Sequence, residues 1–115
     1  MLRGEIYWVN LDPTLGTEIK KTRPCVVVSN NIANQNYYQI TVLPITTQHL
    51  SKTHPFEVLL LKEKTGLPKN GKALAQQIRT VSKERLGKRS GLIQDEETLQ
   101  KIASAIQLHL GLLTE

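Results

Sequence analysis

One segment of the sequence runs Thr22-Arg23-Pro24-Cys25-Val26-Val27-Val28-Ser29-Asn30. Its centre is an apolar run of β-branched residues, which is typical of a strand that is buried on both faces, or nearly so. We therefore expect a strand over residues 24–29. Cys25 lies inside this run, which favours a buried, unreactive thiol over a nucleophile. The segments on either side indicate further strands.

Aromatic and β-branched residues in period-two alternation predict four more strands. Turn signals such as Asp12-Pro13 and Pro68-Lys69-Asn70-Gly71 bound these segments. Pro44 interrupts one of them and indicates an edge or a bulge. The predicted strands cover residues 5–11, 38–46, 56–62 and 72–81.

After residue 81 the pattern changes to a helical one. Ser82 can cap one helical turn over 82–86, residues 87–91 break it, and Leu92-Ile93 could pair briefly as a strand. A helix follows, with Asp95 as its N-cap and apolar residues at helical spacing, namely Leu99, Ile102, Ala103, Ile106, Leu110 and Leu113. Five or six short strands and one amphipathic helix suggest a small β-barrel in a single domain, residues 1–115.

Charge and composition limit the classes of function. The 115 residues carry a net charge of +5, and residues 37–92 hold ten Lys and Arg against three Asp and Glu. Two interpretations stay open: a solvated lysine-rich face, or a surface that binds nucleic acid. The single Cys25 excludes an intrachain disulfide and a cysteine-cluster metal site. With no membrane-length apolar run and no signal-peptide pattern, we expect a cytoplasmic protein without membrane association.

Candidate chemistry gathers where loops meet strands. The sequence shows no catalytic triad order, phosphate-binding loop, dinucleotide fingerprint or histidine pair at metal spacing. Polar side chains instead cluster in residues 17–23, 46–48 and 76–80. Such groups are costly to bury without partners, so they either pair internally or face a ligand.

Five segments in register carry a family resemblance. The chain resembles the MazF/PemK toxin endoribonucleases over residues 1–113, through Arg3-Gly4-Glu5-Ile6-Tyr7-Trp8-Val9-Asn10-Leu11-Asp12-Pro13, Gly16-Thr17-Glu18, Thr22-Arg23-Pro24-Cys25-Val26-Val27-Val28-Ser29-Asn30, Leu43-Pro44-Ile45-Thr46-Thr47, and Gln76-Gln77-Ile78-Arg79-Thr80-Val81-Ser82-Lys83-Glu84-Arg85-Leu86.

The resemblance implies a mainly β (α+β) fold of the CcdB/MazF type found in plasmid maintenance toxins. This is an SH3-like β-barrel of five to seven short antiparallel strands with a C-terminal amphipathic helix. It also implies a homodimer that cleaves single-stranded RNA, usually mRNA, at a short sequence without a metal ion or other cofactor. A toxin of this kind inhibits growth and is paired with an antitoxin, for which the basic surface predicts an acidic partner.

The family's catalytic arginine and threonine fall on Arg23 and Thr46. Attack by the 2′-OH gives a 2′,3′-cyclic phosphate and a 5′-OH, and these two side chains suit the negative charge that develops on the phosphate. Because arginine stays protonated at neutral pH, the general base is open. Glu18 could accept a proton, orient Arg23 or hold its loop, and His49 is a third candidate.

Polar and cationic side chains on the loops and the predicted fifth strand are the expected RNA contacts. They are Thr17, Lys20, Lys21, Thr47, Gln77 and Arg79.

Two other functions compete with the ribonuclease. A CcdB-type gyrase poison acts through C-terminal residues that include a tryptophan, whereas this chain ends in Leu110-Gly111-Leu112-Leu113-Thr114-Glu115 and its one tryptophan is Trp8. An inert SH3-like module that binds RNA without cutting it would have the same basic composition.

Overall fold

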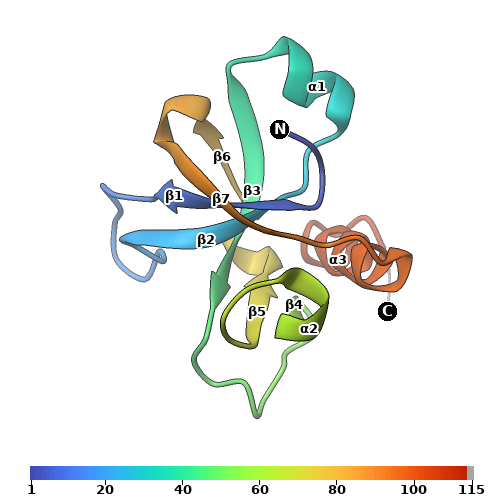
Figure 1. Ribbon diagram of the computed structural model, residues 1–115. Helices are drawn as coiled ribbons and strands as arrows, with labels where there is room; N and C mark the ends of the chain where they lie inside the picture. Colours follow the sequence, from blue (N-terminus) through green and yellow to red (C-terminus); the bar gives the residue numbers. More distant parts are fainter. Residues whose placement is uncertain (114–115) are drawn as a thin grey trace.

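The computed structural model describes residues 1–113 and contains seven strands and three α-helices (Figure 1). Thr114 and Glu115, which end the segment that argues against a gyrase poison, lie outside the described residues. The strands are β1 (Glu5–Asn10), β2 (Thr22–Val27), β3 (Gln39–Thr46), β4 (Glu57–Leu60), β5 (Gly71–Leu74), β6 (Arg79–Ser82) and β7 (Leu86–Leu92).

All strand pairs are antiparallel, and the sheet is strongly curled. Its order is β4-β5-β3-β2-β1-β7, and β6 adds to β3. Within residues 1–113 no ladder joins β7 to β4 or β6, so the sheet does not close into a hydrogen-bonded ring. The predicted mainly β architecture with a C-terminal helix is confirmed, and the barrel is an open one.

The predicted fifth strand, residues 72–81, is in fact two strands. A 3₁₀ turn, η1 (Ala75–Gln77), separates β5 from β6. The cause lies in β3, because β6 pairs with its first half, through Gln39 to Val42, and β5 with its last two residues, Ile45 and Thr46. The register shifts between these two pairings, and η1 takes up the extra residues.

The C-terminal helix α3 (Glu96–His109) confirms the predicted one. The Asp95 side chain caps it by accepting the Thr98 N–H at 3.0 Å. The helix ends at Leu110, so Leu113 lies beyond it. Among residues 1–113, none of the helices has the length and apolarity needed to cross a bilayer.

Two short helices lie outside the predicted elements, except that Lys62 was expected to end a strand. In α1 (Asn31–Asn36), the Asn30 side chain accepts the Ala33 N–H, and α2 (Lys62–Thr65) ends at Gly66 with a positive φ of 80°. The predicted turn near 82–86 is the 3₁₀ turn η2 (Lys83–Arg85), capped by Ser82 as expected. β7 is longer than the predicted pair Leu92-Ile93.

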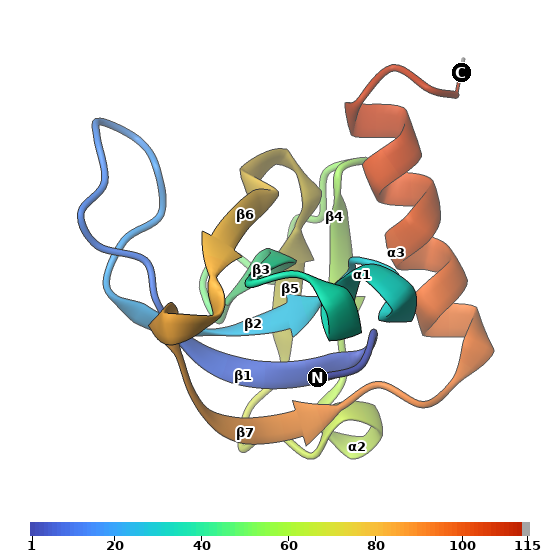
Figure 2. The same cartoon turned by 90° about the horizontal axis from the view of Figure 1, so that it is seen from above.

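The apolar side chains form two core clusters, one on each face of β1, β2 and β3. The larger includes Ile6, Val26 and Leu43 and is covered by α3 through Ile102 and Ala105. The smaller contains Val9, Leu11, Cys25, Val27, Ile40, Val42 and Val81. Figure 2 shows α3 on one side of the sheet and the β1–β2 loop, residues 11–21, projecting on the other. That loop is therefore remote from the helix.

Candidate active site

The two predicted catalytic residues lie on adjacent strands. Arg23 is the second residue of β2, Thr46 is the last of β3, and both are partly buried. β2 and β3 pair with Cys25 opposite Pro44. Cys25 and Pro44 are the last pair of this ladder. Continued by two residues, its register would set Arg23 opposite Thr46, and opposite residues of an antiparallel pair point to the same face. Two strands thus bring a guanidinium and a hydroxyl from distant segments to one end of the sheet.

Local backbone contacts orient both side chains. The Nε–H of Arg23 donates to the Lys20 carbonyl oxygen at 2.8 Å, and Oγ1 of Thr46 accepts the Gln48 N–H at 3.2 Å. Neither bond uses the terminal amino groups of the guanidinium or the hydroxyl hydrogen of the threonine. Both residues therefore keep donors that an anion could accept.

A hollow of about 530 Å³ adjoins Arg23. We call it the Trp8 hollow. Its wall includes Arg23 and the predicted RNA-binding residue Thr47. The full wall is formed by Trp8, Thr22, Arg23, Pro24, Ile45, Thr47, Leu67, Pro68, Lys69, Gly71 and Ser90. Trp8 lies opposite Pro24 across β1 and β2 and is 41% exposed. An exposed indole beside cations suits a stacked base.

Trp8 and Lys69 are site candidates that the sequence reasoning missed. The alternation in residues 5–11 places Trp8 on the same face of the predicted strand as Ile6. Whether that face is exposed depends on how the strand pairs with its neighbours. Lys69 belongs to a predicted turn, and it reaches the wall of the Trp8 hollow because β5 pairs with the end of β3.

A second hollow, of about 690 Å³, lies under the β1–β2 loop. This loop hollow gathers four predicted site residues, Thr17, Glu18, Gln77 and Arg79, within a wall formed by Pro13, Thr14, Leu15, Thr17, Glu18, Ile19, Gln76, Gln77, Ile78 and Arg79. The predicted residues therefore divide between two hollows, because Arg23 and Thr47 line the other one.

Gln77 and Arg79 hold the β1–β2 loop. The Gln77 side-chain oxygen accepts the Ile19 N–H at 3.3 Å, and Nη1 of Arg79 donates to the Leu11 carbonyl at 2.7 Å. Gln77 was predicted on a strand, but it lies in η1. Both side chains keep further N–H donors that could face the loop hollow.

The Glu18 carboxylate closes a turn within its own loop. Its Oε1 accepts the Leu15 N–H at 2.6 Å, and the residue is exposed. Of the three roles open for Glu18, holding the loop is the one that has a contact in the structure.

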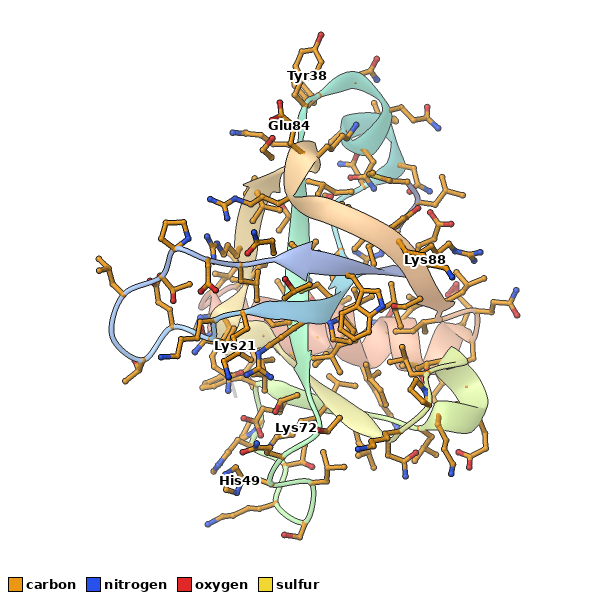
Figure 3. All side chains as sticks on the ribbon, turned by 60° about the vertical axis from the view of Figure 1, so that its left-hand side comes forward. Lys21, Tyr38, His49, Lys72, Glu84 and Lys88 are labelled. Carbon is orange, nitrogen blue, oxygen red and sulfur yellow. The ribbon has the colours of Figure 1, made fainter. Side chains whose placement is uncertain are left out.

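The other loop candidates are exposed. Lys20 contributes its carbonyl to Arg23, and Lys21, with a positive φ of 74°, donates its N–H to Asp12 at 3.2 Å. His49 lies in the β3–β4 loop, residues 47–56, with a φ of 56°. Figure 3 shows Lys21 and His49 toward the same side of the molecule, with Tyr38 and Glu84 at another end.

Cys25 is buried and unreactive, as predicted. Its side chain is 0% exposed, and burial raises the pKa of its thiol to about 12, although the positive charges of Arg79 and Arg23 oppose this increase. Arg23 is two residues from Cys25 along β2, so the two side chains lie on the same face of the sheet.

The residues that the structure describes contain no group of three or more His, Cys, Asp or Glu side chains arranged to hold a metal ion.

Known proteins are similar to this chain in sequence and in fold. Residues 2–110 match the family described as PemK-like, MazF-like toxin of type II toxin–antitoxin system. Endoribonuclease MazF9 of Mycobacterium tuberculosis is 44% identical, over 97% of this chain and 98% of its own length. Endoribonuclease toxin MazF of Escherichia coli is 37% identical, over 94% and 92%.

Among solved structures, an endoribonuclease in complex with its cognate antitoxin, from a mycobacterial species, superposes with a TM-score of 0.79. That protein is 28% identical, and the match covers 100% of this chain and 99% of the other. The family match and the sequence similarity cover nearly the whole chain, and the chain belongs to the PemK-like, MazF-like toxins of type II toxin–antitoxin systems.

Proposed function

We propose that this protein is the toxin of a toxin–antitoxin pair and a sequence-specific endoribonuclease that cuts single-stranded RNA, chiefly mRNA, and so inhibits growth. The observation that carries the proposal is the pairing of β2 with β3, in which Arg23 and Thr46 each lie two residues beyond the last paired residues, Cys25 and Pro44. The endoribonuclease names of the relatives in Mycobacterium tuberculosis and Escherichia coli support it.

The reaction uses the nucleophile that RNA itself carries. The 2′-oxygen attacks the neighbouring phosphorus, the bond to the 5′-oxygen breaks, and the products carry a 2′,3′-cyclic phosphate and a 5′-OH. The protein then has two tasks, which are to align the 2′-oxygen with the leaving 5′-oxygen and to stabilise the charge added to the phosphoryl oxygens.

Arg23 and Thr46 perform the second task. The planar guanidinium can donate to two phosphoryl oxygens while staying charged, and the Thr46 hydroxyl can donate to a third acceptor. Since the guanidinium supplies the positive charge, the proposed reaction requires no metal ion.

Proton transfer involves Glu18 or His49 in this proposal. The Glu18 carboxylate already accepts the Leu15 N–H, and this contact supports a role in holding the loop. No contact in the structure supports a role as the base. Replacement of Glu18 by Gln keeps an oxygen for the Leu15 N–H and removes the base. Loss of the rising limb of the pH–rate profile in this variant would identify Glu18 as the base, and an unchanged profile would exclude it.

RNA binding is assigned to the two hollows and their rims. Thr47 contacts the RNA in the Trp8 hollow, and Thr17, Gln77 and Arg79 contact it in the loop hollow. Lys20 and Lys21 supply charge for the phosphates from the exposed β1–β2 loop. Single-stranded bases can be read there by amide and hydroxyl groups.

The proposal includes two protein partners, an acidic antitoxin and a second copy of the chain in a cytoplasmic homodimer. The net charge of +5 supports the first. The exposure of Leu110, Leu112 and Leu113 at the C-terminal end supports the second, because such side chains gain by being covered.

The decisive experiment maps the ends produced from a long RNA and then cuts a short single-site RNA. We expect a 2′,3′-cyclic phosphate, full activity with a metal chelator, and resistance of a substrate with 2′-deoxyribose at the cut. We also expect Arg23→Ala to lower the rate by about 10²–10³ or more without unfolding the protein. Cleavage of the deoxy substrate at the normal rate would overturn the mechanism, and trapping of DNA–gyrase complexes with RNA spared would overturn the function.

A further inference from the structure

The β3–β4 loop is built around a buried lysine. The side chain of Lys72 on β5 is 6% exposed, and its Nζ lies 3.0 Å from the His49 carbonyl, 3.0 Å from the Lys52 carbonyl and 2.8 Å from Oε1 of Glu57. An ammonium has three donors, so these three acceptors use all of them. Lys72 therefore has no donor left for an RNA phosphate.

Glu57 holds the other end of the same loop. Its Oε1 accepts the His54 N–H at 3.1 Å as well as Lys72, and its Oε2 accepts Nε2 of Gln76 at 2.8 Å. Burial raises the pKa of Glu57, but the hydrogen bonds from Lys72, the His54 backbone and Gln76 outweigh it and hold the pKa at about 2. The carboxylate is therefore charged whenever the loop is in place.

This ion pair is connected to the candidate active site through strand pairing. Lys72 lies opposite Thr46 across β3 and β5, and the loop begins at the residue after Thr46. In Figure 3, Lys72 and His49 lie near each other, at the lower end of β3. A shift of the loop would thus displace Thr46 and Thr47 first.

A buried ion pair is weak evidence for stability, because desolvation offsets much of the attraction between the charges. Its contacts here are more informative. Two of the three acceptors of Lys72 are backbone carbonyls of the loop, and Glu57 takes a loop N–H. The pair therefore selects one loop conformation, which apolar side chains of the same size could not do.

We propose that Lys72 and Glu57 form a positioning pair, which fixes the β3–β4 loop and the end of β3 in the conformation that holds RNA. The inference rests on the proposed function for its effect on cleavage, but its effect on the loop does not depend on that function. Lys72 acts through Thr46, Thr47 and the loop, without touching the substrate.

The test compares Lys72→Met, which keeps the unbranched side chain and removes the donors, with Lys72→Arg, which keeps charge and donors. Lys64→Met is the matched control, since Lys64 pairs with Asp95 at 3.5 Å and is 45% exposed. A misplaced contact can cost about 10²-fold in rate. We expect Lys72→Met to lower kcat/KM by about that factor, mostly through a higher KM, Lys72→Arg to recover much of the loss, and Lys64→Met to match the wild type.

Amide hydrogen exchange of residues 47–55 is the second readout, and it needs no cleavage. We expect faster exchange in Lys72→Met than in the control. Glu57→Gln, which keeps the shape of the side chain, replaces Lys72→Met if that variant does not fold, and should also speed exchange.

The outcomes separate this inference from the proposed function. Unchanged loop exchange together with an unchanged KM in a folded Lys72→Met protein would overturn the inference. A wild-type protein that cuts no RNA would overturn the proposed function alone, because the exchange measurement still decides whether the pair holds the loop.

Discussion

Thr46 offers a substitution that removes its hydroxyl, and with it the acceptor of the Gln48 N–H, while keeping the size of the side chain. Thr46→Val keeps the β-branched shape in the strand and removes the group that would donate to the phosphate. We expect a cleavage rate about 10²-fold lower, as for the loss of one preorganised donor, and near wild-type activity for Thr46→Ser. Single-turnover cleavage of a short RNA measures the effect.

The control for Thr46 comes from the same strand. Oγ1 of Thr41 lies 2.7 Å from Oγ1 of Thr80, at the other end of β3. Thr41→Val should cut RNA at the wild-type rate. A Thr46→Val enzyme as fast as Thr41→Val would remove Thr46 from the reaction.

The lowered pKa of Glu57 leads to a prediction about how stability depends on pH. The pKa of its carboxyl is about 2 in the folded protein against an ordinary value of 4.5. A carboxyl whose pKa is lowered by folding stabilises the protein above its unfolded pKa, and this contribution is lost as the pH falls toward the folded value. We therefore expect the free energy of unfolding to decline between pH 4.5 and about 2.

Urea unfolding at a series of pH values checks this. Glu57→Gln should be less stable at neutral pH and show a shallower decline in the acid window. Glu97→Gln, at an exposed ion pair on α3, should follow the wild-type curve. If Glu57→Gln declined as steeply as the wild type, other carboxyls would be responsible.

At the scale of single residues, sequence reasoning succeeded where the neighbours in the chain decide the environment. Cys25 lies among valines, and its burial follows from them. Lys72 and Glu57 were not predicted as a pair, because β4 and β5 bring together residues that belong to separate segments. Trp8 was missed for a related reason, since only the pairing of β1 with β2 opens a hollow beside it.

Among the elements, β7 depends on a close approach at Gly91. A Cβ built at Gly91 would lie 2.6 Å from the Thr65 carbonyl oxygen in α2, a distance that backbone atoms cannot relieve without moving. We expect Gly91→Ala to lower the free energy of unfolding by about 1–3 kcal/mol, as overpacking does.

Gly87 on the same strand is the matched control. A Cβ there would lie 3.5 Å from the Trp8 carbonyl oxygen, an ordinary contact. Gly87→Ala should change stability by no more than about 0.5 kcal/mol. Equal stability of the two alanine variants in denaturant titrations would contradict the tight packing of β7 against α2.

At the scale of elements, the predictions hold where a pattern is long. The helix after Asp95 and the strands β1 and β3 are confirmed close to their predicted bounds. The predicted strand over residues 72–81 failed because β5 and β6 pair with β3 in two different registers, a shift that the local residues do not encode. The helices α1 and α2 are too short for their periodicity to be visible.

For the whole molecule, the distribution of charge predicts how RNA binding responds to salt. Each phosphate contact on a single strand contributes about 0.7 to the slope of log affinity against log salt. We expect the double variant Lys20→Gln, Lys21→Gln to reduce this slope by about 1.4 for an uncleavable deoxy substrate. Titrations at several salt concentrations measure it.

The same experiment has two informative controls. Lys101→Gln on α3, remote from the β1–β2 loop, should leave the slope unchanged. Lys72→Gln should also leave it unchanged, because that charge is neutralised by Glu57, although the affinity itself falls. A slope that responds equally to all these changes would mean that the protein attracts RNA by overall charge alone.

At this scale the sequence predicted the class of fold, but it predicted a barrel where the sheet does not close. Whether a curled sheet closes depends on the pairing of its edge strands, and β4 and β7 remain edges. The basic middle of the chain also looked uniform as a sequence. The structure divides it into exposed cations, partly buried ones and one buried lysine, Lys72, so the formal +7 of residues 37–92 overstates what RNA can meet.

The way in which the β3–β4 loop is fastened has a consequence for divergence. Lys72 and Glu57 bind the loop through the carbonyls of His49 and Lys52 and the N–H of His54. Any residue has the carbonyl, and any residue except proline has the N–H that position 54 needs. The exposed side chains of the loop are thus separate from its architecture. Under the proposed function, relatives that keep the pair could exchange those side chains and acquire new RNA targets while retaining the loop's shape. A library randomised at positions 48, 51 and 53 is the natural place to select altered specificity.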